Sequence, residues 1–143
     1  MEITNSLKKN ELRKLYHLLS QSNNFMPNGR QYSELYEKFE KDKMNEAAFC
    51  FFDDELVGCA CIFGYQRLQG GLFGIIEDVV VASDFQNQGV GTKLVGYLLR
   101  FACEHNFKRV ALVSSPAGEK IYKKFGFRIR ENYFEKRIDG FAI

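Results

Sequence analysis

The chain has 143 residues, 45% of them hydrophobic and 14 of them phenylalanine, which is enough for a single domain over residues 1–143 with one core. Its net charge is +2, from 20 basic and 18 acidic residues, so its charge gives no reason to expect binding to nucleic acid. No apolar run approaches the roughly 20 residues that span a bilayer, and the N-terminus lacks the apolar region of a signal peptide. We therefore expect a cytoplasmic protein with no membrane partner.

Two helices are expected in the N-terminal third. Leucines recur at helical spacing over residues 6–21, which predicts an amphipathic helix with Ser6 as its N-cap. A stretch rich in Asn, Pro and Gly then interrupts the pattern, and residues 33–43 predict a second, shorter helix. A short strand at Glu2–Thr4 is also compatible with the sequence.

Three strands are expected in the middle of the chain. Apolar runs at residues 47–52 and 56–65 flank the acidic turn Asp53–Glu55, which predicts an antiparallel hairpin. A second turn at residues 67–71 contains two glycines, so a third strand at residues 74–82 extends the meander.

The C-terminal half alternates helices and strands. A strong apolar stripe predicts a helix over Gly89–His105, and the continuous apolar run at 109–115 predicts a strand buried on both faces. Residues 117–125 predict a short helix that ends at Gly126 as a C-cap glycine. Residues 127–138 alternate between apolar and charged types, which predicts one or two closing strands.

This order of elements indicates the α/β (α+β) class, with a mixed, mostly antiparallel central sheet flanked by helices. The strands at residues 75–82 and 109–114 should run parallel, because a right-handed helical crossover joins them. If these two strands splay apart, the gap between them becomes a slot for a ligand, and the sequence does not decide whether they do.

The four cysteines predict no metal site. Cys50, Cys59, Cys61 and Cys103 lie in apolar surroundings without a C-x-x-C pair, and both histidines are distant in sequence from the closest pair. Zinc sites in proteins use tighter ligand spacing. We expect four buried or partly buried structural thiols.

A glycine-containing turn between a predicted strand and a predicted helix carries the pattern Gln86-x-x-Gly89-x-Gly91. It is neither the G-x-G-x-x-G of dinucleotide folds nor a P-loop, because the residues after Gly91 have the wrong order. The N–H groups of Gln88–Thr92 fall in the first helical turn, where they have no partner inside the helix, so they suit a phosphate or pyrophosphate. The alternative is an ordinary connection whose glycines serve packing.

Residues 74–99, followed by Tyr122-x-x-x-Gly126-Phe127, resemble the Gcn5-related N-acetyltransferase (GNAT) family as a small single-domain member. The resemblance implies acetyl-CoA as co-substrate, held in a slot between two splayed parallel strands, and no metal. Its pyrophosphate would meet the turn, and its pantetheine would pair with the backbone of the preceding strand. The implied cofactor-binding residues are Val79, Val80, Val81, Gln86, Asn87, Gln88, Gly89, Val90, Gly91, Thr92 and Ser115.

This sequence departs from the commoner family pattern at two positions. Gln86 stands where arginine is more frequent, which removes one possible charged contact with the cofactor. Ser115 stands where many members have asparagine, and it could cap the following helix, touch the pantetheine, or do both.

The resemblance makes Tyr122 the candidate general acid beside the cofactor sulfur, and the alternative is a tyrosine that only packs. Glu77 and Asp78 are adjacent carboxylates in an otherwise apolar strand, where regular alternation would place Glu77 with Val79 and Val81 and Asp78 on the other face. One of them could accept the amine proton, directly or through water, or bind the ammonium. We favour Glu77 slightly as the base. The alternative is a salt bridge across the sheet. A strand N–H near Val79–Val81 would stabilise the oxyanion.

For the acceptor side, the resemblance implies a pocket formed by the first two helices, their connection and the far end of the sheet. The candidate substrate-binding residues there are Phe25, Arg30, Tyr32, Tyr65 and Arg67. Aromatic and arginine side chains together would suit a small amine that also bears an acid or a phosphate. The alternative is that they are ordinary loop residues.

The first hypothesis is a small-molecule amine as acceptor, since a single-domain chain weighs mildly against a protein acceptor. A weaker likeness, in residues 76–81 and 131–137, is to the glucosamine-6-phosphate N-acetyltransferase branch. A protein lysine or N-terminal amine as acceptor, and a non-catalytic acyl-CoA sensor, are the alternatives. A homodimer is possible because dimers are common in the family. The identity of the acceptor and the use of longer acyl groups stay open.

Overall fold

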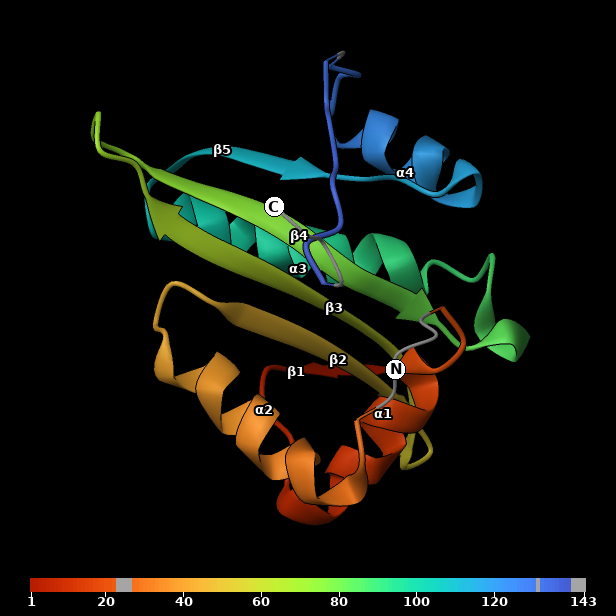
Figure 1. The fold of residues 1–143 in the computed structure, drawn as a ribbon. Helices are drawn as coiled ribbons and strands as arrows, with labels where there is room; N and C mark the ends of the chain where they lie inside the picture. Colours follow the sequence, from red (N-terminus) through yellow and green to blue (C-terminus); the bar gives the residue numbers. More distant parts are fainter. Residues whose placement is uncertain (23–26, 131, 140–143) are drawn as a thin grey trace.

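The computed structural model describes residues 1–22, 27–130 and 132–139, which form one five-stranded sheet with helices on both faces (Figure 1). The strands are β1 (Glu2–Thr4), β2 (Glu46–Phe52), β3 (Glu55–Gln66), β4 (Leu72–Val81) and β5 (Phe107–Leu112). They lie in that order in the sheet, antiparallel except for the parallel pair β4–β5. The helices are α1 (Leu12–Leu19), α2 (Gly29–Lys41), α3 (Val90–Glu104) and α4 (Glu119–Lys124). The predicted fold class is therefore confirmed.

Two apolar clusters fix the layers. Helix α3 packs on one face of the sheet through Leu94, Val95 and Leu98, which are fully buried. Helices α1 and α2 cover part of the opposite face, where Leu15 and Tyr36 pack against β2 and β3. Among the described residues, no helix is both long enough and apolar enough to cross a bilayer.

The first helix begins later than predicted. Strand β1 pairs with β2 up to Thr4↔Phe49, so the chain must then cross from the sheet edge to the helix layer. It does so through a 3₁₀ turn at Lys9–Glu11, where the backbone N–H of Lys8 donates to Glu11 Oε1 at 2.8 Å. The predicted N-cap at Ser6 is therefore wrong, and the short strand at Glu2–Thr4 is confirmed.

The second helix begins earlier than predicted, at Gly29. Asn28 Oδ1 accepts hydrogen bonds from the N–H groups of Arg30 and Gln31, and the Gln31 side chain accepts one from the Asn28 N–H. This reciprocal capping box satisfies donors that an uncapped helix leaves unpaired.

The central hairpin β2–β3 is confirmed, with Asp53 and Asp54 at positive φ in its turn. The opposite edge of β3 meets a bulge in β4. Glu77 pairs with Cys61 and Val80 pairs with Cys59, so two residues of β4 lie opposite one residue of β3 between those pairs.

The bulge changes which way β4 side chains point. Its extra residue is Asp78, which adopts a left-handed backbone with φ of 55°. Val79 and Val81 pack on the α3 face, whereas Glu77 is paired with Cys61 on the α1/α2 face and Asp78 lines a cavity there. The predicted grouping of Glu77 with Val79 and Val81 is therefore wrong, because one inserted residue breaks the alternation.

The two parallel strands separate part-way along their length. Pairing runs from Leu72↔Phe107 to Ile76↔Leu112 and ends there, so no strand of the described residues pairs with the β5-facing edge of Glu77–Val81. The expected separation of these strands is therefore confirmed, and we call the gap beside Glu77–Val81 the slot.

The C-terminal part differs from the sequence-based expectation. Lys108, Arg109 and Ala111 of β5 are exposed and its other residues are only partly buried, and the segments 127–130 and 132–139 contain no strand. The predictions of closing strands in these segments and of a β5 buried on both faces are therefore wrong. Strand β5 does form, but it lies at the edge of the described sheet, where part of it faces solvent. The closing strands are absent from these segments because alternation produces a strand only where its apolar side chains meet the core, and Ile129 and Phe134 remain 76% and 90% exposed.

Candidate active site

The turn between β4 and α3 presents a row of unbonded backbone donors. The first hydrogen bond of α3 runs from the Lys93 N–H to the Gly89 carbonyl at 3.1 Å, and within the described part of the chain the N–H groups of residues 87–92 donate none. Asn87 and Gly89 adopt the left-handed conformation, with φ of 62° and 84°. Successive amides of this kind at the positive end of a helix form a site suited to phosphate groups.

Two glutamine side chains brace this turn. Gln86 Nε2 donates to the Val81 carbonyl at 3.4 Å, and Gln88 Nε2 donates to the Asp84 carbonyl at 3.1 Å. These bonds tie the turn to the end of β4 and to the 3₁₀ turn Ser83–Phe85. The glutamines thus hold the turn in shape while its backbone N–H groups stay unbonded.

The slot lies next to this turn. Because β5 leaves β4 after Ile76, the edge of β4 over Glu77–Val81 offers main-chain N–H and C=O groups to an extended ligand. Ser115, on the far side of the gap, accepts a hydrogen bond from the Gly118 N–H through its Oγ at 3.3 Å. The expected capping role of Ser115 is confirmed, for the 3₁₀ turn Pro116–Gly118 that leads into α4.

Tyr122 of α4 is buried except for its end. The residue is 8% exposed and its ring packs edge-on against Phe127, with centroids 5.8 Å apart. Its hydroxyl has no hydrogen-bond partner among the described residues, and it is not sealed from solvent. Burial raises the pKa of the phenol above its usual value of 10.0, so the hydroxyl keeps its proton at neutral pH.

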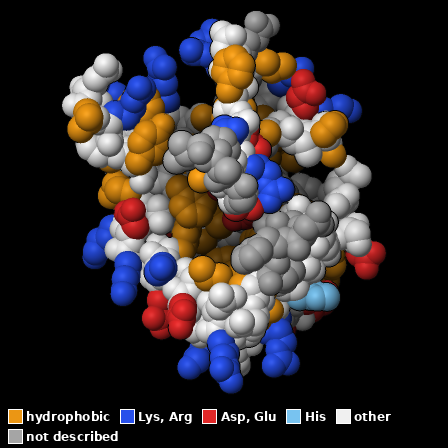
Figure 2. Space-filling view, in the orientation of Figure 1, with side chains coloured by type: hydrophobic (Ala, Val, Ile, Leu, Met, Phe, Trp, Pro, Cys, Tyr) orange, Lys and Arg blue, Asp and Glu red, His pale blue; other side chains and the backbone are white. Residues whose placement is uncertain are grey.

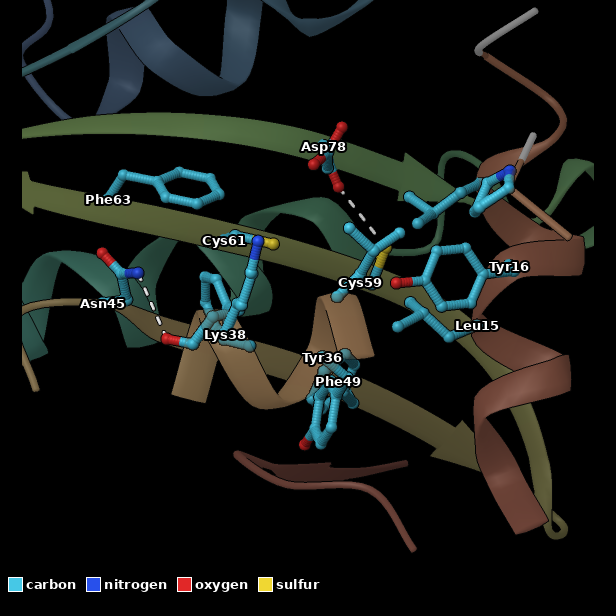
Figure 3. A pocket seen from close by; sticks show the side chains of 15 residues that line it. Leu15, Tyr16, Tyr36, Lys38, Asn45, Phe49, Cys59, Cys61, Phe63 and Asp78 are labelled. Atoms are coloured by element: carbon cyan, nitrogen blue, oxygen red, sulfur yellow. Dashed lines mark hydrogen bonds between the residues drawn. The ribbon is translucent and has the colours of Figure 1, made fainter. Parts of the chain in front are cut away.

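A cavity of about 460 Å³ lies between the sheet and the helices α1 and α2 (Figure 3). The space-filling view shows this face of the molecule hollowed, with apolar atoms within the hollow (Figure 2). Its walls are mostly apolar or aromatic, with a few polar side chains. They consist of Leu15, Tyr16, Leu19, Pro27, Leu35, Tyr36, Lys38, Phe39, Asn45, Ala47, Phe49, Cys59, Cys61, Phe63 and Asp78.

Asp78 connects the cavity with the slot. It belongs to the β4 segment that β5 leaves unpaired, and it also lines the cavity (Figure 3). Desolvation raises the pKa of its carboxyl above 3.8, and no cation of the described chain lies within ion-pair distance of it. The alternative of a cross-sheet salt bridge is thus not seen at Asp78 in the described structure.

Glu77 lies beside Asp78 without lining the cavity. Desolvation and the neighbouring Asp78 carboxylate both raise the pKa of Glu77 above 4.5. It likewise makes no ion pair with a described residue. Two neighbouring carboxylates with raised pKa values are typical of sites that bind or exchange protons.

The four cysteines differ in burial: Cys50 and Cys59 are buried and Cys61 is partly buried as expected, whereas Cys103 is exposed, so the expectation of burial is wrong there. The two thiols in the cavity wall, Cys59 and Cys61, favour the protonated form. Burial raises the pKa of Cys59 to about 12 and that of Cys61 well above 9.0, and the nearby carboxylates act in the same direction. The Cys59 thiol donates to the Asp78 carbonyl at 3.4 Å. In the described residues, no group of three or more His, Cys, Asp or Glu side chains could hold a metal ion.

The structure brings only some of the expected acceptor residues near the cavity. Tyr32 stacks on the cavity residue Tyr16, with centroids 4.3 Å apart and an interplanar angle of 4°. Arg30 is exposed in the first turn of α2. Phe25 lies outside the described residues.

Tyr65 and Arg67 meet at the far end of the β3–β4 hairpin. Tyr65 packs on Phe73 with centroids 6.1 Å apart, and the Arg67 guanidinium lies 4.8 Å from the centre of the same ring. Neither residue lines the cavity. Their role in substrate binding stays a prediction.

Sequence reasoning missed most of the cavity wall. Tyr16, Phe49 and Phe63 come from α1, β2 and β3, and each fits the apolar pattern of its own element. Periodicity marks such residues as inward-facing, and it does not distinguish a cavity wall from a filled core.

The family model described as the acetyltransferase (GNAT) family matches residues 12–127 of this chain. The matched region includes the β4–α3 turn, the bulge at Asp78 and Tyr122.

Many solved structures share the fold. Glucosamine-6-phosphate N-acetyltransferase from Arabidopsis thaliana superposes with a TM-score of 0.86 at 20% identity, covering 97% of this chain and 100% of its own. An acetyltransferase from Trypanosoma brucei superposes with a TM-score of 0.84 at 23% identity, and the match covers 96% of this chain and 99% of that one. A predicted acetyltransferase from Clostridium acetobutylicum, whose structure was determined with acetyl-CoA, superposes with a TM-score of 0.74 at 18% identity. This match covers 99% of this chain and 100% of that one.

Proposed function

This chain belongs to the GNAT acetyltransferase family, and we propose that it transfers the acetyl group of acetyl-CoA to the primary amine of a small molecule. The observation that carries this proposal is the position of Asp78. Its strand segment borders the slot on one side, and its side chain lines an apolar cavity on the other. A donor in the slot and an acceptor in the cavity would therefore meet at one residue.

Acetyl-CoA is the donor that the β4–α3 turn and the open edge of β4 would suit. The unbonded N–H groups of residues 87–92 suit its pyrophosphate, and the open edge of Glu77–Val81 suits the amides of its pantetheine. Gly91 allows α3 to lie close to α4, because a Cβ on Gly91 would lie 3.1 Å from Ile121 Cδ1, and Gly89 gives the turn its positive φ of 84°. When bound, acetyl-CoA supplies an activated thioester.

Asp78 is the better placed of the two carboxylates to bind the acceptor. A primary amine with an ordinary pKa near 10 is protonated at neutral pH and must lose that proton before it can attack. An unpaired carboxylate at the mouth of an apolar cavity attracts the ammonium and can take its proton, directly or through water. Glu77, next to it, remains the alternative base, with the Asp78 carboxylate then holding the amine.

Tyr122 supplies the proton that the departing thiolate needs. Its phenol keeps its proton at neutral pH, because burial raises its pKa, and its hydroxyl is unbonded in the described structure. Cys59 and Cys61 stay protonated for the same reason, which argues against an acetyl-cysteine and for direct attack of the amine.

The test is purified protein with acetyl-CoA, a panel of amines and a readout of free thiol. The panel contains small amines, a lysine peptide and a peptide with a free N-terminus. Release of CoA with small amines supports the proposal, and release only with the peptides would assign a protein substrate. Tight binding of acetyl-CoA without release of CoA on any amine would indicate a sensor instead.

A further inference from the structure

We infer that the acceptor is a primary amine with an apolar body, an arylalkylamine or a branched alkylamine, which fills the cavity beneath α1 and α2. This inference rests on the proposed acetyl transfer and narrows its substrate class. The ammonium of the amine would lie at Asp78, and its apolar body would lie among the aromatic rings of the walls.

The walls offer rings from separate elements. Phe39 of α2 meets Phe63 of β3 edge-on with centroids 5.2 Å apart, and Tyr36 meets Phe49 with centroids 6.4 Å apart. Tyr16 of α1 reaches the same cavity, as Figure 3 shows. Rings held against one another in this way form a rigid apolar surface, which suits an apolar ligand without further ordering.

Two of the polar lining residues already use their hydrogen-bonding groups. Asn45 donates to the Phe39 carbonyl at 3.2 Å and accepts from the Gly64 N–H at 3.3 Å. The Tyr36 hydroxyl accepts from the Leu7 N–H at 2.8 Å. Each therefore presents mainly its carbon atoms to the cavity, although its type is polar.

Asp78 is the one carboxylate among the described lining residues, and Lys38 is the one cation. Asp78 has no ion-pair partner in the described chain, and both Asp78 and Lys38 keep a solvent-exposed part while they line the cavity. A carboxylate without an ion-pair partner beside an apolar wall attracts a cation, and the ammonium of a ligand would supply that charge.

A phosphorylated or highly hydroxylated acceptor fits this cavity poorly. A phosphate dianion is usually held by several charge-assisted bonds, often from arginine. Arg30 and Arg67, the expected candidates, do not line the cavity, and Lys38 alone is exposed at its rim. Hydroxyl groups would also lose bonds to water, and among the described wall residues the Tyr16 hydroxyl and the charged groups of Lys38 and Asp78 are the few oxygen or nitrogen groups free to replace them.

The test compares kcat/KM for acetyl transfer along the series from ethylamine to pentylamine, and for 2-phenylethylamine, spermidine and glucosamine 6-phosphate. Each added methylene should raise kcat/KM about fourfold until the cavity is filled. We expect 2-phenylethylamine to exceed glucosamine 6-phosphate and spermidine by at least ~10-fold. If kcat/KM stays constant from ethylamine to pentylamine, or is highest for glucosamine 6-phosphate, the inference about the acceptor is overturned. Acetyl transfer itself would still be supported by either result.

A binding measurement separates the two proposals. Calorimetric titration of 2-phenylethylamine without acetyl-CoA tests the cavity independently of catalysis. Asp78→Asn should weaken this binding about 10- to 100-fold, the range for a lost bond to a charged group. If no amine releases CoA but 2-phenylethylamine binds through Asp78, the transfer proposal fails and the cavity assignment holds. If it does not bind at all, the cavity assignment fails.

Wall variants complete the design. Phe63→Ala should lower kcat/KM for 2-phenylethylamine at least ~10-fold and for ethylamine much less. Phe63→Leu keeps an apolar side chain, so its kcat/KM for 2-phenylethylamine should lie between those of the unsubstituted protein and Phe63→Ala. This variant keeps the proposal testable if Phe63→Ala does not fold. Leu68→Ala is the matched control, because Leu68 is 108% exposed at the β3–β4 turn and does not line the cavity. Equal losses for both amines in Phe63→Ala would contradict the assignment.

Discussion

Tyr122→Phe should remove a proton donor and leave the surrounding structure in place. The ring of Tyr122 is 8% exposed and packs against Phe127, and phenylalanine preserves these contacts. The hydroxyl that is lost has no hydrogen-bond partner among the described residues, so no buried group is left unsatisfied. We expect the free energy of unfolding to change by no more than about 0.5 kcal/mol.

The catalytic effect should be much larger. A positioned general acid typically contributes about 10²- to 10⁴-fold to the rate, so kcat should fall by a factor in this range. Affinity for acetyl-CoA should be unchanged within about twofold, because the proposed contacts of the pyrophosphate come from the backbone of residues 87–92. Tyr122→Ala is uninformative by comparison, since truncating a buried aromatic side chain costs about 3–5 kcal/mol of stability.

Three measurements on one preparation test this reasoning. Urea denaturation gives the stability, calorimetry gives the affinity for acetyl-CoA, and the release of CoA with a saturating amine gives kcat. A kcat within threefold of the unsubstituted protein, with stability and affinity unchanged, would remove Tyr122 from the mechanism. A parallel loss of stability would instead show that the hydroxyl has a structural role.

Three further outcomes are expected. Gly89→Val and its control Gly70→Val both place a β-branched residue at positive φ with open space around the new Cβ, so each should lose about 1–2 kcal/mol of stability. Calorimetry should show weaker binding of acetyl-CoA in Gly89→Val only, because Gly70 lies outside the proposed cofactor site. Asp78→Asn should lower kcat/KM for the amine but raise Tm at pH 7. The pKa of the Asp78 carboxyl is higher in the folded protein than the value of 3.8 in the unfolded chain, so its ionisation destabilises the fold as pH rises from the unfolded pKa through the folded pKa. Equal Tm values for the two proteins at pH 7 would contradict this sign. At pH 8, iodoacetamide should label the exposed Cys103 far faster than Cys61, and radiolabelled acetyl-CoA should leave no stable label on the protein without an amine.

The parts of the fold that follow from burial patterns could be predicted from the sequence. Helix α3 was predicted within a residue at each end, because Leu94 and Leu98 repeat at helical spacing and both are fully buried. The β2–β3 hairpin was predicted because its acidic turn separates two apolar runs. The early start of α2 was missed although its signal was present, since Asn28 followed by Gln31 three residues later is a capping box.

The arrangement of the site could be predicted only in part. The β4–α3 turn was identifiable because a local motif carries it. The bulge at Asp78 was not, because aspartate at positive φ leaves no mark in a strand of regular composition. The cavity joins Tyr16 to Phe63, residues far apart in sequence, and only the packing of α1 on the sheet brings them together. The closing strands failed because an alternating pattern carries no information about whether an edge is available to pair with it.

The unbonded amides of residues 87–92 have a consequence for the way this chain tolerates change. Every residue except proline carries the same main-chain donor, so most side-chain replacements in the turn would keep the donors and only backbone shape would be under constraint. Replacements of Gln88 or Gly89 should therefore act through the shape of the turn, which these residues support, and not through the loss of a donor. Chains that share only 18–23% of their residues with this one can keep the same fold. A binding surface formed by main-chain N–H groups would be retained through such divergence in sequence.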